Sequence, residues 1–199
     1  MYEGVDTVVL HNELAYEDVL PVGWRTLSKP LDLAAVAVLT ERNVRTLQVC
    51  ATIEEQGPVE KAEDKSLHSS DLLRLEVKMN LVLELMGQLL AAHQARPAAT
   101  SLRFNALGAV WQTATPPRSG EQGLLDIWLR DCLAQPLSLI ANVTQVTSEG
   151  RVKATFTPPG EATADLIEKL AFRRHRRHVA GVRQPRRSPG ETGITRILG

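Results

Sequence analysis

The most regular hydrophobic pattern in the chain is a heptad repeat in the segment 71–94. Its apolar residues alternate at spacings of three and four, as the a and d positions of a coiled coil do. The a and d residues are Leu72, Leu75, Met79, Val82, Met86 and Leu89. The segment has no proline and a single glycine, Gly87, and is otherwise rich in good helix formers. This pattern predicts a long helix that buries one face in an oligomer.

The apolar face of this helix is wider than a two-stranded coiled coil requires. Charges usually occupy the e and g positions, which here begin with Glu76 and Lys78 but continue with leucines such as Leu83 and Leu85. Either several helices share a bundle core, or the helix packs on its own domain and on partners at once. A core helix of a monomeric bundle has the same periodicity. We expect a homotetramer with parallel helices, and the charges within 71–84 argue against a membrane span.

A second helix with a weaker seven-residue repeat precedes this segment. It is expected from 31 to about 55, after Pro30 and before a Gly-Pro pair at 57–58. Its apolar stripe is Leu33, Ala37, Thr40, Val44, Leu47 and Ala51, with Asn43 and Gln48 beside it. The charged, small residues of 59–70 then indicate a loop between two consecutive heptad helices.

Strand-like sequence flanks this helical insertion on both sides. Before it, 7–10 and 17–24 are apolar or extended runs. After it, alternating patterns predict strands at 101–106, 109–114, 123–129, 137–147 and 151–157. Turn signals every eight to twelve residues favour a small barrel or sandwich. A further helix is expected over 161–182.

These elements predict an α+β fold in four parts. Residues 1–30 supply an N-terminal strand segment that joins the barrel, and 31–96 form the coiled-coil oligomerisation insertion. The barrel and the C-terminal helix occupy 97–182. Residues 183–199 are rich in turn formers and basic residues, so we expect a flexible tail.

Length and cysteine content indicate whether the chain can bury a core and in which compartment it folds. With 199 residues the chain is long enough to bury a core without disulfides. Cys50 and Cys132 form no CxxC pair and fit two ordinary buried thiols in a reducing compartment. The first residues lack the basic start and long apolar run of a signal peptide, so we expect a cytoplasmic protein.

Charge is unevenly distributed although the net charge is zero. Residues 1–70 hold 12 acidic and 6 basic residues, whereas 161–199 hold 4 acidic and 9 basic ones. Seven arginines and no acid fall within 173–187. Guanidinium groups bind phosphate oxygens well, so the cluster fits a nucleotide or nucleic-acid partner. Equally, it fits a solvated basic helix end stabilised by the helix dipole.

Catalytic and metal-binding motifs are not evident. There is no Gly-rich phosphate loop, HExxH or nucleophile elbow. His68 and His93 stand alone and are expected at the surface or in the helical seam. His175 and His178 could share a helix face, but the arginines around them would repel a divalent cation.

Two aspartates near the third main strand were the remaining candidates for chemistry. Asp126 and Asp131 have no histidine or serine partner suggested by spacing, and strand-end carboxylates are usually solvated. We therefore expect a protein that is not an enzyme, with no cofactor and no metal.

Two segments carry a resemblance to a known family. One is LRFNALGAVW at 102–111, in the expected barrel; the other is LAFRRHRRHVA at 170–180, in the expected last helix. Together they resemble the PilZ domain family, and more narrowly its atypical tetrameric branch. Members of that branch end in a similar FRxHRR-type helix and carry long heptad helices ahead of the main barrel strands. The resemblance spans about 16–183 and implies a small antiparallel β-barrel and a role in bacterial cyclic di-GMP signalling, in processes such as motility or virulence.

The same resemblance implies where a ligand would bind. PilZ domains hold cyclic di-GMP with an RxxxR segment ahead of the barrel and a DxSxxG turn. In this sequence Arg103 replaces the aspartate, Asn105 replaces the serine, and only Gly108 matches. Ahead of the barrel, 93–96 contains one arginine; an RxxxR spacing occurs instead in the last helix. The candidate ligand-binding residues are Arg173, Arg174, Arg177, Arg103, Asn105 and Gly108.

Three functions fit these observations. The favoured one is a non-catalytic PilZ-like adaptor that assembles through its heptad helices and recruits an unidentified signalling protein. The second is a cyclic di-GMP receptor whose C-terminal arginines fold back over the Gly108 turn. The third is a nucleic-acid-binding oligomer, although only Phe172 offers an aromatic ring for stacking on bases near the tail.

Overall fold

The structure, a computed structural model, describes residues 15–55, thirteen positions between 72 and 89, and residues 96–182, with side chains up to 176 in the last helix. The expected strand at 7–10, the loop residues 59–70 with His68, His93 and the tail 183–199 lie outside the described residues. The regular elements are β1 (Tyr16–Thr26), α2 (Leu33–Glu55), β2 (Ala99–Phe104), β3 (Gly108–Gln112), β4 (Gln122–Ile127), β5 (Leu137–Val146), β6 (Arg151–Phe156) and α4 (Glu161–Val182).

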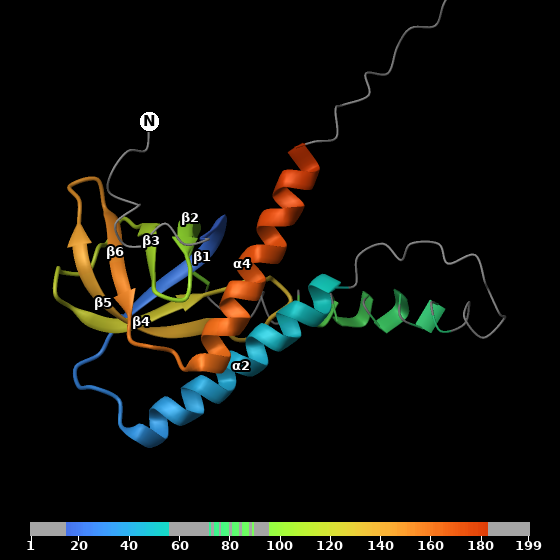
Figure 1. Ribbon diagram of the computed structural model, residues 1–199, viewed down its shortest axis with the longest axis horizontal. Helices are drawn as coiled ribbons and strands as arrows, with labels where there is room; N and C mark the ends of the chain where they lie inside the picture. The colour runs from blue at the N-terminus through green and yellow to red at the C-terminus, as the bar shows by residue number, and fades with distance from the viewer. Residues whose placement is uncertain are drawn as a thin grey trace, which may run out of the picture.

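The six strands form a closed antiparallel barrel in the order β1-β2-β3-β6-β5-β4 (Figure 1). The long strand β1 closes the barrel, because its first half pairs with β2 and its second half pairs with β4. Every second side chain points inward, so residues such as Leu102, Phe104 and Leu125 are fully buried. The predicted barrel is confirmed, with strand ends within two residues of their expected positions.

The helix α4 packs its apolar face against the barrel core and also contacts α2. Ile167, Leu170 and Ala171 are each about 1% exposed. They recur every three or four positions, so they lie on one face of the helix. The observed bounds of α4 are those that its sequence predicts.

The helix α2 lies against β5 and supplies hydrogen-bond partners to β5 beyond the end of β6. The side chain of Asn43 donates from Nδ2 to the Ser138 carbonyl at 2.6 Å and accepts from the Ser138 amide at 3.0 Å. The register of β6 on β5 extends only from Ala141 to Val146, so Ser138 lies beyond the end of β6. One buried side-chain amide therefore pairs a backbone N–H and C=O that would otherwise be orphaned.

The buried face of α2 differs from the stripe that its repeat predicts. Leu33 is 90% exposed and Ala37 is also exposed, whereas the buried positions are Asn43, Thr46, Leu47, Cys50 and Glu54. The first turns of α2 extend past the barrel, so they bury nothing there (Figure 1). The predicted stripe was therefore wrong at its first two members, and polar residues that pair with the barrel occupy part of the buried face.

The segment with the strongest heptad pattern projects away from the barrel (Figure 1). All thirteen described positions between 72 and 89 are helical; we call this segment the arm. Near its C-terminal end it contacts the β4–β5 connection, because a Cβ on Gly87 would lie 2.5 Å from Cys132 Cα. The glycine thus allows the arm to approach the barrel closely. None of the helices in the described part of the chain is long and apolar enough to cross a membrane.

Candidate functional site

The arginine expected to bind ligand from the last helix is instead paired inside the protein. Arg174 donates from Nε to Glu54 Oε1 at 2.6 Å, and its Nη2 lies 2.5 Å from the same oxygen. The side chains are 10% and 0% exposed, respectively. Arg174 Nη2 also donates to the Leu129 carbonyl at 3.2 Å. This guanidinium therefore fastens α4 to the end of α2 and to the segment that follows β4.

Other charged groups surround this pair. Arg130 Nη2 lies 3.7 Å from Glu54 Oε1, and Arg174 Nη1 lies 3.8 Å from Asp18 Oδ2 on β1. Burial raises the pKa of the Cys50 thiol, and the nearby Glu54 carboxylate raises it further. We call Asp18, Cys50, Glu54, Arg130 and Arg174 the junction cluster. It joins β1, α2, α4 and the β4–β5 connection close to the base of the arm.

The turn that corresponds to the family's ligand motif uses its polar side chain internally. Asn105 Oδ1 accepts hydrogen bonds from the amides of Leu107 at 2.8 Å and Gly108 at 3.1 Å, and the Asn105 side chain is buried. The Asn105 amide donates to the Gly108 carbonyl at 3.1 Å. Asn105 thus stabilises the tight connection between β2 and β3, which is a structural task.

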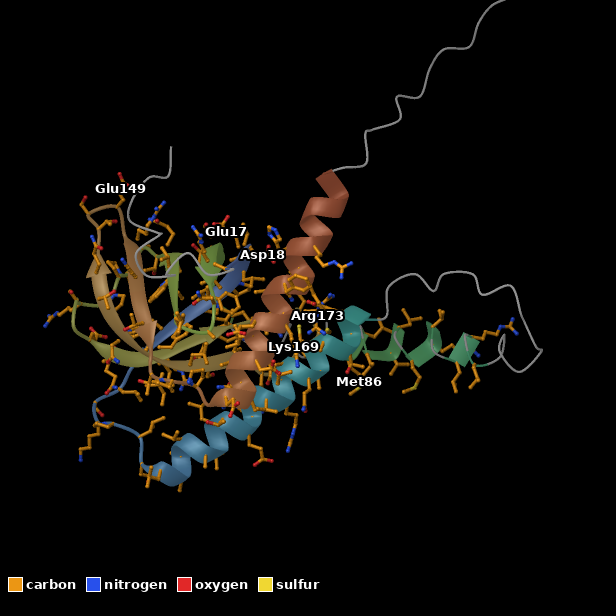
Figure 2. The ribbon with its side chains drawn as sticks, viewed as in Figure 1. Glu17, Asp18, Met86, Glu149, Lys169 and Arg173 are labelled. Carbon is orange, nitrogen blue, oxygen red and sulfur yellow. The ribbon has the colours of Figure 1, made fainter. Side chains whose placement is uncertain are left out.

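The arginine that replaces the motif's aspartate is engaged by a neighbouring strand. Arg103 lies on β2 directly across from Glu17 on β1, and its Nε is 3.3 Å from Glu17 Oε1. A guanidinium has no acceptor atom, so Arg103 cannot repeat the aspartate's part in binding. Glu17 and Asp18 are labelled in Figure 2 on the strand beside α4.

The remaining candidates lie along α4. Arg173 is half-buried and lines a shallow surface hollow with Lys169 and Phe172. Figure 2 labels Arg173 and Lys169 on α4. Arg177 belongs to the helix, but its side chain lies outside the described residues. The candidate ligand residues therefore divide among three places: the β2–β3 turn and its strand, the junction cluster, and the outer face of α4.

The structure corrects the expectation for Asp126. This carboxylate is only 4% exposed and does have a serine partner, because Ser138 Oγ donates to Asp126 Oδ1 at 2.5 Å. Arg25 also binds it in a bidentate manner, with Nε to Oδ2 at 2.5 Å and Nη2 to Oδ1 at 3.0 Å, which raises the pKa of Arg25. The pairing follows from cross-strand register that local spacing does not reveal. Asp131 is solvated as expected, with a side chain 95% exposed.

The group formed by Arg25, Asp126 and Ser138 lacks the parts of a hydrolytic site. A nucleophilic serine needs an adjacent base such as histidine, whereas Ser138 is buried between a carboxylate and α2. No group of histidine, cysteine or acidic residues within the described part of the chain could hold a metal ion. Cys132, expected to be buried, is only half-buried.

Glu121 is a second carboxylate that the sequence did not single out. It accepts from Thr26 Oγ1, from the Arg118 amide at 3.0 Å and from Trp24 Nε1 at 2.9 Å. These hydrogen bonds, that of Thr26 first, lower the pKa of Glu121 to about 2. The contacts fix the rim of the barrel where β1 meets β4, and Trp24 stacks there on Trp111 at 5.9 Å.

Most of the exposed large apolar side chains in the described part of the chain lie on the arm. Ten of its large apolar side chains are 49–67% exposed in the single chain, and Met86 lies on the part nearest the barrel (Figure 2). They are Leu72, Leu75, Val77, Met79, Leu81, Val82, Leu83, Leu85, Met86 and Leu89. Contiguous apolar patches of this extent are rare on monomers and mark interaction sites. Every described a and d position of the predicted seam belongs to this set.

Comparison with known proteins identifies the family. A family model described as an atypical PilZ domain, cyclic di-GMP receptor, matches residues 47–184, well over half of the chain. The chain belongs to the atypical PilZ domain family. It is thereby a PilZ-family protein of cyclic di-GMP signalling, as the FRxHRR-type helix predicted. Among curated proteins, no match is found.

The fold agrees with a solved structure of the same class. A pathogenic protein from Xanthomonas campestris, described as a new tetrameric PilZ domain self-assembled via an unusual helical bundle, superposes with a TM-score of 0.69. The two share 24% sequence identity, and the match covers 88% of this chain and 95% of that one. At this identity the likeness establishes the fold of this PilZ protein, a six-stranded barrel with helices.

Proposed function

We propose that this protein is a non-catalytic PilZ adaptor of a cyclic di-GMP pathway that assembles as a homotetramer through the arm. The observation that carries the proposal is the row of half-exposed apolar side chains on the arm. Burying them between copies would remove a large apolar area from water, which is the main driving force of association. The helical bundle of the Xanthomonas campestris neighbour supports the same use of helices.

The arrangement of the candidate ligand residues supports an adaptor rather than a receptor. Arg174 is committed to Glu54, Asn105 to its own turn, and Arg103 to Glu17. Withdrawing a buried arginine from its acid would leave an unpaired carboxylate, which is strongly unfavourable. A partner protein would then bind the assembled barrels, and cyclic di-GMP would act elsewhere in the pathway.

The assembly is tested by light scattering coupled to gel filtration. We expect a tetramer for the unmodified chain and smaller species for Leu75→Glu combined with Val82→Glu, because each buried unpaired charge costs several kcal/mol. The matched control is Val38→Glu with Val49→Glu, two equally drastic changes on the exposed side of α2. A monomeric unmodified chain would refute the assembly, as would equal disruption by the control.

Ligand binding is tested separately by calorimetric titration of the tetramer with cyclic di-GMP. Loss of one charge-assisted hydrogen bond costs about 1.5–3 kcal/mol, or roughly ten- to a hundredfold in affinity. We therefore expect no binding at tens of micromolar ligand, an order-of-magnitude threshold from that arithmetic. A saturable low-micromolar isotherm would make the protein a receptor instead, and Arg173→Ala and Arg177→Ala would then identify the clamp.

A further inference from the structure

The outer face of α4 carries an ordered charge pattern that the arm does not explain. Opposite the buried face, one stripe runs along the helix at spacings of three and four. Its members are Asp165, Lys169, Phe172 and Arg176, at spacings of four, three and four. The acid is at the N-terminal end of the stripe and the arginine is at its C-terminal end. Phe172 stands between them and is 53% exposed, which is unusual for an aromatic ring on a charged helix face.

The side chains of this stripe are held near the surface by contacts within the helix. Lys169 Nζ lies 2.7 Å from Asp165 Oδ2, with side chains 61% and 54% exposed. The Arg176 guanidinium lies over the Phe172 ring at 5.8 Å from its centroid. Beside the ring, a shallow hollow is lined by Asp165, Glu168, Lys169, Phe172 and Arg173. The stripe therefore offers an aromatic anchor, a hollow next to it and charges of both signs.

We propose that this stripe is a self-association surface that takes the α4 stripe of a second copy in antiparallel orientation. The two-fold axis lies at the level of the helix between residues 170 and 171. A residue before this level therefore faces the residue of the second copy that lies equally far after it. Asp165 then faces Arg176 of the second copy. Because the interface is isologous, this ion pair occurs twice. A single register therefore brings the Asp165 of each copy to the Arg176 of the other.

The centre of the same register explains the exposed ring. Lys169 of one copy faces Phe172 of the other, so an ammonium approaches a ring face, which is a favourable cation–π arrangement. The hollow beside Phe172 gives the ring of the second copy a place to insert. A parallel pairing would instead oppose acid to acid and arginine to arginine, which is destabilising. The charge order on the helix therefore selects both the partner and the direction.

The contact is small, since the stripe spans only about 16 Å of helix. Such an area supports a weak interface on its own. In a protein already assembled through its arms, several α4 stripes act together, and avidity then strengthens the contact. We therefore expect association of whole assemblies that grows with concentration and weakens with salt.

Charge-swap variants of the full chain test the inference by sedimentation velocity. One variant carries Asp165→Arg, and the other carries Arg176→Glu. Each alone should lower the concentration-dependent association by about tenfold, since like charges now face each other. Mixed in equal amounts, the two should associate again, because every pair regains opposite charges. Phe172→Ala should weaken association in either background.

The controls separate this surface from the arm and from general charge effects. Glu41→Arg with Arg45→Glu alters an equally exposed ion pair on α2 and should change nothing. Light scattering at low concentration should show the same arm-dependent species for all variants, so a failed tetramer and a failed α4 contact are distinguishable. If either swap variant perturbs folding by circular dichroism, the neutral changes Asp165→Asn and Arg176→Gln decide the question, because each removes one partner of the ion pair and should weaken association. Unchanged association in the swap variants, or a mixture no better than its parts, would overturn the proposal.

Discussion

The junction cluster allows one prediction to be worked through in magnitude. Replacing Arg174 by methionine keeps most of the side-chain volume but leaves the Glu54 carboxylate, which is 0% exposed, without its closest cation. Breaking a buried ion pair on one side costs about 3–5 kcal/mol. For a chain of this size, that corresponds to a fall in Tm of roughly 6–20 °C. The main loss should be in the attachment of α4 to α2, because Arg174 joins these two helices.

The double variant Glu54→Leu with Arg174→Met should recover much of this loss. Buried ion pairs can be replaced by apolar residues at little cost, or with a gain of about 1–4 kcal/mol. The lost hydrogen bond to the Leu129 carbonyl opposes that gain by about 1–3 kcal/mol. We therefore expect the double variant within about 2 kcal/mol of the unmodified protein, and clearly more stable than Arg174→Met alone.

The assay is urea unfolding followed by circular dichroism at one fixed protein concentration, because association contributes to apparent stability. Arg45→Met is the matched control: its ion pair with Glu41 is about three-quarters exposed on both sides, and such pairs contribute about 0.5 kcal/mol or less. The reasoning fails if Arg174→Met stays within about 1 kcal/mol of the unmodified protein. It also fails if the double variant is less stable than the single one.

Three further predictions concern other parts of the barrel. Asn43→Ala should destabilise the protein by about 2 kcal/mol or more in urea unfolding, since it orphans the backbone N–H and C=O of Ser138; a loss below about 0.5 kcal/mol would contradict this. Glu121 has a pKa lowered from 4.5 to about 2, so its stabilising effect is complete above pH 4.5 and is lost as the pH falls toward 2. Glu121→Gln should therefore flatten acid unfolding over that range, and an unchanged pH profile would exclude the role. Iodoacetamide should label Cys132 in the native protein and reach Cys50 only after unfolding, because burial removes access to Cys50 and raises its pKa; mass spectrometry showing equal labelling rates would refute this.

The periodicity of the sequence determined the elements of this protein. Alternating residues in β2 to β6 encode strands because side chains in a strand point alternately to two faces. The three-and-four spacing of the arm encodes a helix with an apolar face, and the side chains at its a and d positions are exposed in the single chain. The barrel segment 102–111 and the FRxHRR-type ending of α4 together carried the resemblance to the family, which the family model confirms. Each of these signals is local, so a window of the sequence contains it completely.

The same local reasoning did not reveal the partners of the polar residues. Arg174 reads as a ligand arginine in the sequence because its acid, Glu54, is 120 positions away. The sequence indicated a solvated Asp126 because its partner Arg25 is 101 positions away. It indicated no partner for Asn43 because Ser138 is 95 positions away. A charged side chain has the same identity whether water or a buried partner surrounds it, and no spacing rule distinguishes the two.

Tertiary structure decided these partners through the closure of the barrel. Strand β1 pairs with both β2 and β4, and this brings Arg25 to Asp126 and Glu17 to Arg103. The crossing of α2 and α4 over the barrel then brings Glu54 to Arg174. Burial makes an unpaired charge costly, so the packed chain retains only arrangements in which each buried charge meets its opposite. The sequence therefore determines which residues can form strands, helices and an apolar seam, and only the closed barrel determines which arginines pair with acids inside the protein and which lie on its surface.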